Sequence, residues 1–359
     1  MPPHRHFERS EKSLSFAGRR PMGKPQTGNP MPRRSSGLVP FRHPELSQMS
    51  FVRKVVCGMW STEPKDLGEA AAFPLNLLPP VEPANPKEIF MKLGLIGEVL
   101  GHSLSPVIHE KLFHKLSIPG RYDLIEIPRD HFGEVLRDTL TARDGLNVTI
   151  PYKLDVIPFL DDISPEAKTI GAVNTIAKTD GKLVGYNTDY FGFQRTLRKI
   201  DAKVNGKVAV VLGHGGASRA IIQCLYDEGA AEIRVISRHP EKVDSDLRSF
   251  AEERRVRLMD YAAFEREVEG ALLVNATPVG MYPKVGVSPI SKEAARHFSK
   301  VIDIIYNPKE TRLLHDASHA DKANGMYMLV MQAIAAEEIW LEREIPDRIA
   351  EEIAEEMGG

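Results

Sequence analysis

Residues 208–227 read VAVVLGHGGASRAIIQCLYD. Five apolar residues typical of a buried strand lead into a glycine-rich turn, and a helix-forming stretch follows from Ala217 to Asp227, with Gly229 as its C-cap. This order is typical of a dinucleotide-binding fold, because glycines let backbone N–H groups approach a pyrophosphate at the helix N-terminus. A tight turn without a ligand is the alternative for the loop residues Gly213, His214, Gly215, Gly216 and Ala217.

Apolar strands alternate with helical stretches from Met91 onward, which predicts an α/β fold with parallel sheets. Upstream of the glycine loop, Pro106 stands at the first position of a helix predicted from Ser105 to about Lys115. The other predicted elements follow the loop: strands at 233–236, 271–274 and 301–305, and helices at 326–343 and 346–357.

The end of the strand after the glycine loop distinguishes NAD from NADP in such folds. An acidic residue there would bind the ribose 2′-OH of NAD, but this chain has Ser237 and Arg238. A guanidinium suits a 2′-phosphate because its planar fork can donate two hydrogen bonds. The sequence therefore predicts NADP as the cofactor, and a solvated surface arginine is the alternative for Arg238.

A polar cluster is predicted beside a β-hairpin. Two strand-like runs, 172–177 and 182–186, flank Asp180-Gly181, a dipeptide typical of a two-residue hairpin turn. Residues paired across this turn have numbers that sum to 361, as 180 and 181 do, so Ala172 is placed opposite Asp189 and residue 174 opposite residue 187. Asn174 and Asp189 then lie at the same end of the ribbon, with no helix to cap, as expected of a site for a polyol.

Three more polar side chains stand beside apolar runs. Ser103 and Ser105 are two residues apart in an extended segment, so both hydroxyls point to one side. Ser105 precedes a proline, and a helix N-cap is an equal alternative for it, whereas Ser103 has no such local role. Lys153 follows an alternating strand that Pro151 interrupts, and a lysine in such a place is usually a surface residue.

Composition limits the function classes. The 359 residues suit two domains, and the 42% hydrophobic and 27% charged content is typical of a soluble globular protein. No stretch approaches eighteen uncharged apolar residues, so no membrane span is expected. The two cysteines, Cys57 and Cys224, fit a reducing compartment, and we expect a cytoplasmic protein. Neither has Cys or His at ligand spacing, so no metal site is expected.

The N-terminal 90 residues differ from the rest. They contain 14 of the 26 prolines and no sustained hydrophobic period, so we predict a disordered, basic extension. Within it, residues 1–60 carry eleven Lys/Arg and three Glu, which leaves about −10 on the rest, a poor nucleic-acid binder. A transit peptide is one interpretation of the extension. Translation from Met91 is the favoured one, because strand-like sequence begins there.

From about Lys92 to Ile345 the chain resembles the shikimate dehydrogenase family. The resemblance implies an N-terminal α/β substrate domain at 91–191, completed by C-terminal helices at 325–357. It also implies a Rossmann-type NADP-binding domain at 192–324 and an active-site cleft between the two. The matching strings, in the family's order, are GLIGEVLGHSLSP, GLNVTIPYK, GAVNTI, GYNTDYFGF, VLGHGGASRA, VNATPVGM, DIIYNP and NGMYMLVMQA.

The resemblance implies reduction of 3-dehydroshikimate to shikimate with NADPH, by a monomer or homodimer. Lys153 would be the general acid and base, partnered by Asp189. The substrate carboxylate would be held by Ser103, Ser105 and Tyr306, and the ring hydroxyls by Thr149, Asn174, Asp189 and Gln332. The nucleotide would lie on Gly213 to Ala217, on Ser237 and Arg238, and near Thr277, Ile304 and Gly325.

Two alternatives remain at this stage. One is a quinate dehydrogenase, or a quinate/shikimate dehydrogenase of dual specificity. The other is a non-catalytic sensor of the metabolite, which would have no reason to retain both Lys153 and Asp189. Tyr327 replaces a residue that is more often small, and we expect it beside the nicotinamide. His109 belongs to no evident catalytic constellation, and we expect an ordinary residue there.

Overall fold

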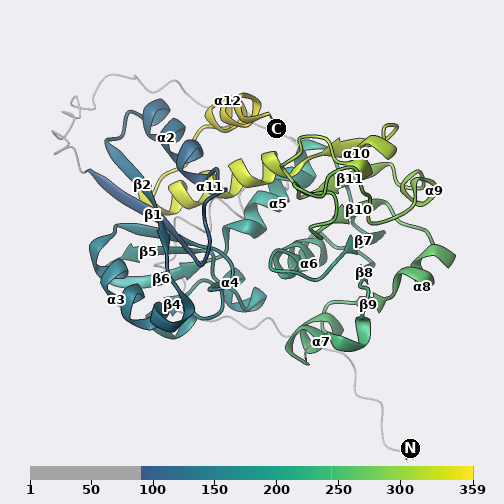
Figure 1. Ribbon diagram of the computed structural model, residues 1–359, viewed down its shortest axis with the longest axis horizontal. Helices are drawn as coiled ribbons and strands as arrows, with labels where there is room; N and C mark the ends of the chain where they lie inside the picture. Colours follow the sequence, from purple (N-terminus) through teal and green to yellow (C-terminus); the bar gives the residue numbers. More distant parts are fainter. Residues whose placement is uncertain (1–89, 244, 359) are drawn as a thin grey trace, which may run out of the picture. The chain divides into compact units, whose positions relative to one another are not determined.

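The computed structural model describes residues 90–243 and 245–358 of the chain. These residues form two six-stranded sheets with helices packed around them (Figure 1). The predicted α/β fold is therefore confirmed. The predictions made for the extension before residue 90 fall outside the described residues. No helix in the described part of the chain is long and apolar enough to cross a membrane.

The first sheet is mixed rather than parallel. Its strand order is β2-β1-β3-β5-β6-β4, and neighbouring strands run parallel except where β5 is one of the pair. The prediction of parallel sheets is wrong here because the Asp180-Gly181 hairpin reverses the chain inside this sheet. The strands are β1 (Met91–Gly97), β2 (Gly120–Glu126), β3 (Gly145–Val148), β4 (Asp162–Ile163), β5 (Thr175–Thr179) and β6 (Lys182–Tyr186).

The hairpin has the predicted register. Thr175 pairs with Tyr186, and the pairs that follow toward the turn keep the same sum of 361. Asp180 and Gly181 both have positive φ angles, 50° and 75°, as expected of the two central residues of a type I′ turn. The turn type therefore accounts for the strand register.

The paired region ends earlier than predicted, because helix α5 (Thr188–Lys199) begins there. Asp189 therefore lies in the first turn of a helix and not on a strand opposite Ala172. The Asn187 side chain donates instead to the Ala172 carbonyl oxygen at 2.9 Å. The expectation that no helix is capped here is also wrong, because the Asn174 side-chain oxygen accepts the N–H of the first residue of α5 at 2.7 Å.

The second sheet is parallel throughout, as predicted. Its order is β12-β11-β10-β7-β8-β9, and its central strands are almost fully buried, as expected when helices cover both faces. The three strands predicted after the glycine loop start and end within two residues of their predicted bounds. The strands are β7 (Val208–Leu212), β8 (Glu232–Ile236), β9 (Val256–Met259), β10 (Leu272–Asn275), β11 (Lys300–Asp303) and β12 (Asp321–Ala323).

Helices lie on both sheets (Figure 1). The short 3-10 helices η1, η2 and η3 follow strands β2, β3 and β8. The helices near the first sheet are α2 (Ser105–Leu116), η1 (Arg129–His131), α3 (Phe132–Ala142), η2 (Ile157–Phe159), α4 (Pro165–Ile170), α5, α11 (Gly325–Leu341) and α12 (Asp347–Met357). Those of the second sheet are α6 (Ser218–Asp227), η3 (Pro240–Lys242), α7 (Ser245–Glu252), α8 (Tyr261–Arg266), α9 (Lys292–Ala295) and α10 (Arg312–Asp316).

Helix α11 is apolar on nearly every face, and such a helix is stable only where it is buried. It packs against α2, α5, α12 and strand β5 (Figure 1). The closest approach is at Gly192 of α5, where a Cβ atom would lie 2.8 Å from the Met328 carbonyl oxygen and 3.0 Å from the Gln332 Cβ. The missing side chain at 192 therefore brings Asp189 of α5 and Gln332 of α11 onto neighbouring turns.

Candidate functional site

A cavity of about 370 Å³ opens where the ends of first-sheet strands meet α11 and the start of α6. Every residue that the sequence predicted for the substrate lines it. This set is Ser103, Ser105, Thr149, Lys153, Asn174, Asp189, Tyr306 and Gln332. Three of the residues predicted for the cofactor also line it: Ala217, Ile304 and Gly325.

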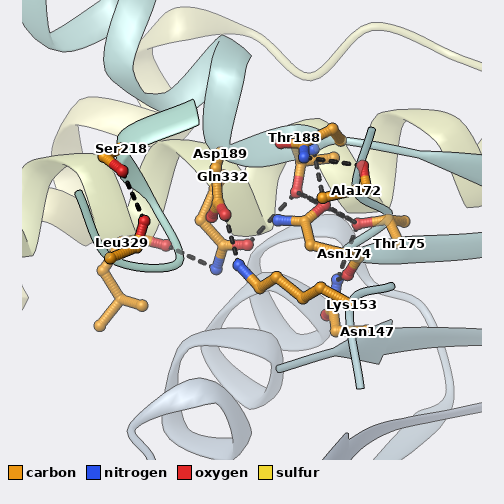
Figure 2. A network of polar contacts seen from close by, with 12 residues as sticks. Asn147, Lys153, Ala172, Asn174, Thr175, Thr188, Asp189, Ser218, Leu329 and Gln332 are labelled. Atoms are coloured by element: carbon orange, nitrogen blue, oxygen red, sulfur yellow. Dashed lines mark hydrogen bonds and ion pairs between the residues drawn. The ribbon is translucent and has the colours of Figure 1, made fainter. Parts of the chain in front are cut away.

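An ion pair between Lys153 and Asp189 occupies the cavity wall. The ammonium nitrogen lies 2.5 Å from a carboxylate oxygen, and each side chain is 14% exposed (Figure 2). The surface interpretation of Lys153 is therefore wrong. Asp189 is in the first turn of α5, where the helix dipole favours a negative charge. The ammonium and the carboxylate thus lie side by side on a wall that is largely shielded from solvent.

The amide of Asn174 is held in one orientation. Its side-chain oxygen accepts hydrogen bonds from the Thr188 backbone N–H at 2.7 Å, the Thr188 hydroxyl at 3.2 Å and the Thr175 hydroxyl at 3.1 Å. Its amide nitrogen has no partner among the residues that the structure describes. Asn174 lines the cavity, so this arrangement leaves its NH₂ group available as a donor there (Figure 2).

Gln332 reaches the same wall from α11. Its amide nitrogen donates to the Leu329 carbonyl oxygen at 3.1 Å (Figure 2). Its oxygen lies 3.3 Å from the Thr188 hydroxyl, whose single proton it shares with the Asn174 oxygen. Leu329 itself is partly buried and lines the cavity.

The local roles of Ser103 and Ser105 differ from those predicted. Helix α2 has Leu104 as its N-cap, and Ser105 is its first residue, so the N-cap alternative for Ser105 is wrong. Ser103 has the local role instead, because its hydroxyl oxygen accepts the Ser105 backbone N–H at 3.2 Å. Ser105 is nearly buried, and both side chains line the cavity.

Asn147 is a cavity residue that the sequence reasoning missed. It lies on β3 and is 5% exposed. Its side-chain oxygen accepts the Tyr122 hydroxyl at 2.6 Å, and its nitrogen donates to the Thr175 hydroxyl at 3.0 Å and the Asn174 carbonyl oxygen at 3.3 Å. An amide inside an otherwise apolar buried strand was the available signal, since such a group needs partners.

Tyr327 lies away from the cavity, contrary to the prediction. Its ring is buried, and its hydroxyl donates to Glu351 of α12 at 2.6 Å. The Lys199 ammonium lies 5.1 Å from the ring centre. A helix presents successive residues to different sides, so Tyr327 faces α12 and α5 while Met328 lines the cavity.

The glycine loop has the shape that a pyrophosphate requires. Gly213 has a φ of 91° and donates its N–H to the Ile236 carbonyl oxygen at 2.8 Å, and a Cβ there would lie 2.7 Å from the Thr277 side chain. Gly215 and Gly216 are exposed immediately before α6, so their backbone remains open at a helix N-terminus. These residues fit a dinucleotide, and Thr277 lies directly behind them.

The end of β8 carries Ser237 and Arg238. The Ser237 backbone N–H donates to the Met259 carbonyl oxygen at 2.9 Å, and its hydroxyl oxygen accepts the His239 N–H at 3.1 Å. Arg238 is exposed. Burial raises the pKa of Tyr261, and the positive charge of Arg238 opposes this rise. The end of β8 thus carries the basic side chain of Arg238, and no acidic residue occupies the position that would bind the ribose 2′-OH of NAD.

A buried carboxyl group connects the loops behind the glycine loop and Tyr306. Asp303 ends β11 and is fully buried, accepting hydrogen bonds from Asn275 at 3.0 Å, the Ile305 N–H at 3.1 Å and the Thr311 hydroxyl at 2.7 Å. Burial raises the pKa of Asp303 to about 6, and these hydrogen bonds oppose the rise. The side-chain oxygen of Asn275 in turn accepts a hydrogen bond from the Thr277 hydroxyl at 2.7 Å. Asp303 therefore supports both the loop that carries Thr277 and the loop that carries Tyr306.

Comparisons with known proteins agree with this site. A family model for the shikimate dehydrogenase substrate binding domain matches residues 95–176. Shikimate dehydrogenase (NADP(+)) of Clostridium beijerinckii is 45% identical over 261 residues, 72% of this chain and 94% of that protein.

Two solved structures extend the match to three dimensions. A chorismate mutase/shikimate 5-dehydrogenase fusion protein from Clostridium acetobutylicum has a TM-score of 0.69 at 42% identity, over 75% of this chain and 97% of that one. Shikimate 5-dehydrogenase from Thermus thermophilus, in complex with NADP(H) and shikimate, has a TM-score of 0.66 at 32% identity, over 75% and 100%. The chain therefore belongs to the shikimate dehydrogenase family.

Proposed function

We propose that this protein is an NADP-dependent shikimate dehydrogenase that reversibly reduces 3-dehydroshikimate to shikimate. The observation that carries the proposal is the Lys153–Asp189 ion pair, in a cavity lined by polar groups from six separate segments. The relatives' names support the substrate and the cofactor. A sensor of the metabolite would bind it without needing a paired proton donor beside the ring.

Lys153 is the general acid of the reduction and the general base of the reverse reaction. NADPH, when bound, supplies the hydride for the carbonyl carbon. Negative charge then develops on the carbonyl oxygen, and the ammonium of Lys153 delivers a proton to it. Asp189 accepts a hydrogen bond from that ammonium at 2.5 Å, which orients it.

The remaining polar residues hold the ring in one orientation. Ser103, Ser105 and Tyr306 bind the carboxylate with hydroxyl groups. The ring hydroxyls are bound by Thr149, Asn174, Asp189 and Gln332, which offer both donors and acceptors. A polyol with several hydroxyl stereocentres is discriminated well by such a site, because a misplaced hydroxyl leaves a buried partner unpaired.

The cofactor lies on the glycine loop and the end of β8. We assign the pyrophosphate to Gly213, His214, Gly215, Gly216 and Ala217, the 2′-phosphate to Ser237 and Arg238, and the nicotinamide to the surroundings of Thr277, Ile304 and Gly325. Residues 192–324 would then form the NADP-binding domain, and residues 91–191 with 325–357 the substrate domain. We further infer a cytoplasmic monomer or homodimer.

The proposal is tested by assaying the purified protein with shikimate and with quinate, each against NADP and NAD. We expect the highest kcat/KM for shikimate with NADP. Quinate carries an additional hydroxyl on the carbon that bears the carboxylate, where Ser103 and Ser105 would crowd it. Comparable kcat/KM values for the two acids would instead establish the dual-specificity enzyme, and no turnover of either would remove the proposal.

A further inference from the structure

A buried polar arrangement lies behind the cavity and extends away from it. His109 of α2 and Glu337 of α11 are both fully buried, with the imidazole Nδ1 2.8 Å from a carboxylate oxygen. The imidazole stacks on the ring of Tyr122 with a centroid separation of 3.9 Å and an interplanar angle of 5°. The expectation that His109 is an ordinary residue is therefore incomplete, because the pair holds the tyrosine ring in place.

The hydroxyl of Tyr122 donates a hydrogen bond to Asn147. Burial raises its pKa well above the ordinary 10, and the charge of Glu337 adds to this, while a hydrogen bond with Ser105 opposes it. The hydroxyl therefore keeps its proton at any working pH. It lies 2.6 Å from the Asn147 side-chain oxygen, which can only accept, so Tyr122 is the donor.

The orientation of each following group is then determined. Because the Asn147 oxygen is taken by Tyr122, its nitrogen faces the Thr175 hydroxyl at 3.0 Å and donates to it. That hydroxyl consequently has its own proton free for the Asn174 side-chain oxygen, 3.1 Å away. Together with the Thr188 backbone N–H, which donates at 2.7 Å, the Thr175 hydroxyl holds the Asn174 oxygen inward, and the NH₂ group is left for the cavity (Figure 2).

We propose that Tyr122 is a positioning residue that acts through Asn147 and Thr175 to hold Asn174 with its NH₂ group toward the substrate. That the Asn174 NH₂ group donates to a substrate hydroxyl oxygen rests on the proposed function. The directions of the hydrogen bonds from Tyr122 to Asn174 do not depend on that function. A reversed Asn147 amide would place its oxygen against the Asn174 carbonyl oxygen, and neither of these atoms can donate.

The first experiment is a cycle of KM measurements for shikimate with Tyr122→Phe, Asn174→Asp and the double variant. Tyr122→Phe keeps the ring stacked on His109 and removes only the donor, so we expect KM to rise about tenfold and kcat to change by less than about twofold. Asn174→Asp keeps the inward oxygen and removes the NH₂ group. If Tyr122 acts through Asn174, the double variant has the KM of Asn174→Asp.

Tyr152→Phe is the matched control. Tyr152 is also fully buried, stacks on Phe132 and donates to the Ile127 carbonyl oxygen, but has no bond to Asn147. We expect it to lower the melting temperature with KM unchanged. An unchanged KM in Tyr122→Phe, or KM increases that multiply in the double variant, would overturn the proposal.

A second experiment is independent of turnover. Exchange of the Asn147 side-chain NH₂ protons with solvent is followed by NMR in the ligand-free protein. Loss of the Tyr122 donor should accelerate this exchange about tenfold, whereas Tyr152→Phe should leave it unchanged. Equal exchange in the wild type and Tyr122→Phe would refute the role of Tyr122. If the wild type fails to oxidise shikimate, the proposed function fails while this measurement still decides the positioning role.

Discussion

The ammonium of Lys153 is the one cationic group paired with a carboxylate on the described cavity wall. Replacing it with alanine removes the proton donor but leaves the substrate contacts of the other residues. We therefore expect Lys153→Ala to lower kcat by roughly a hundredfold or more, with a much smaller change in KM. Lys178→Ala, which removes an exposed lysine of β5, is the control and should keep normal kinetics. Near-normal turnover of Lys153→Ala would exclude it from the mechanism.

Arg238 is expected to select the cofactor. Loss of a charged contact to the 2′-phosphate costs on the order of 2 kcal/mol, which is roughly thirtyfold in affinity. Arg238→Ala should therefore raise KM for NADP by about that factor and leave KM for NAD nearly unchanged. Arg248→Ala removes another exposed arginine of the same sheet's helices and controls for general charge effects. Equal losses for both cofactors would show that Arg238 does not read the phosphate.

At the scale of elements, the His109–Glu337 pair joins α2 to α11. Both groups are fully buried, so removing the imidazole leaves a carboxylate without a partner in the interior. We expect His109→Ala to reduce the free energy of unfolding by about 3–5 kcal/mol, measured by chemical denaturation.

Three variants test the cause of that loss. Glu337→Gln keeps a hydrogen-bonding partner and should be much milder than His109→Ala. His114→Ala, on an exposed turn of the same helix, should stay within about 0.5 kcal/mol of the wild type. The double variant His109→Leu with Glu337→Leu should recover much of the stability, since no charge is then buried. A double variant as unstable as His109→Ala would mean that packing, and not the unpaired carboxylate, causes the loss.

The free energy of unfolding of the whole molecule should depend on pH because of Asp303. Burial raises the pKa of this carboxyl from 3.8 to about 6, so between those values the folded protein holds a proton that the unfolded chain has released. Stability therefore falls as the pH rises through this window, by roughly 3 kcal/mol at most. Asp303→Asn cannot titrate, so its stability relative to the wild type should increase from about pH 4 to about pH 6.

The comparison is made by urea denaturation at several pH values. Asp201→Asn, which replaces an exposed aspartate, is the control, and its difference from the wild type should stay nearly constant. A difference between Asp303→Asn and the wild type that does not change with pH would show that Asp303 titrates normally.

The local structures follow from short stretches of the chain. Asp180-Gly181 fixed the hairpin register because a two-residue turn leaves only one pairing, and residues 208–227 fixed a strand, loop and helix because glycine alone tolerates the turn. Residue patterns alone singled out Ser103, Ser105, Lys153, Asn174 and Asp189, and the family resemblance added Thr149, Tyr306 and Gln332. All eight line the cavity. The hairpin pattern did not predict where helix α5 begins. Strand pairing across a turn gives no information on which group accepts the first N–H of the helix, here the Asn174 side-chain oxygen.

Contacts between groups far apart in the chain depend on how the helices and sheets pack. His109 and Glu337 are 228 residues apart, and Tyr122 and Asn147 are 25 apart on strands that both flank β1. Neither helix periodicity nor turn chemistry specifies such pairs, because both describe neighbours along the chain. Tyr327 shows the same limit, since its direction depends on the rotation of α11 against α5 and α12. The polar groups behind the cavity became visible once packing had placed their partners within hydrogen-bonding distance.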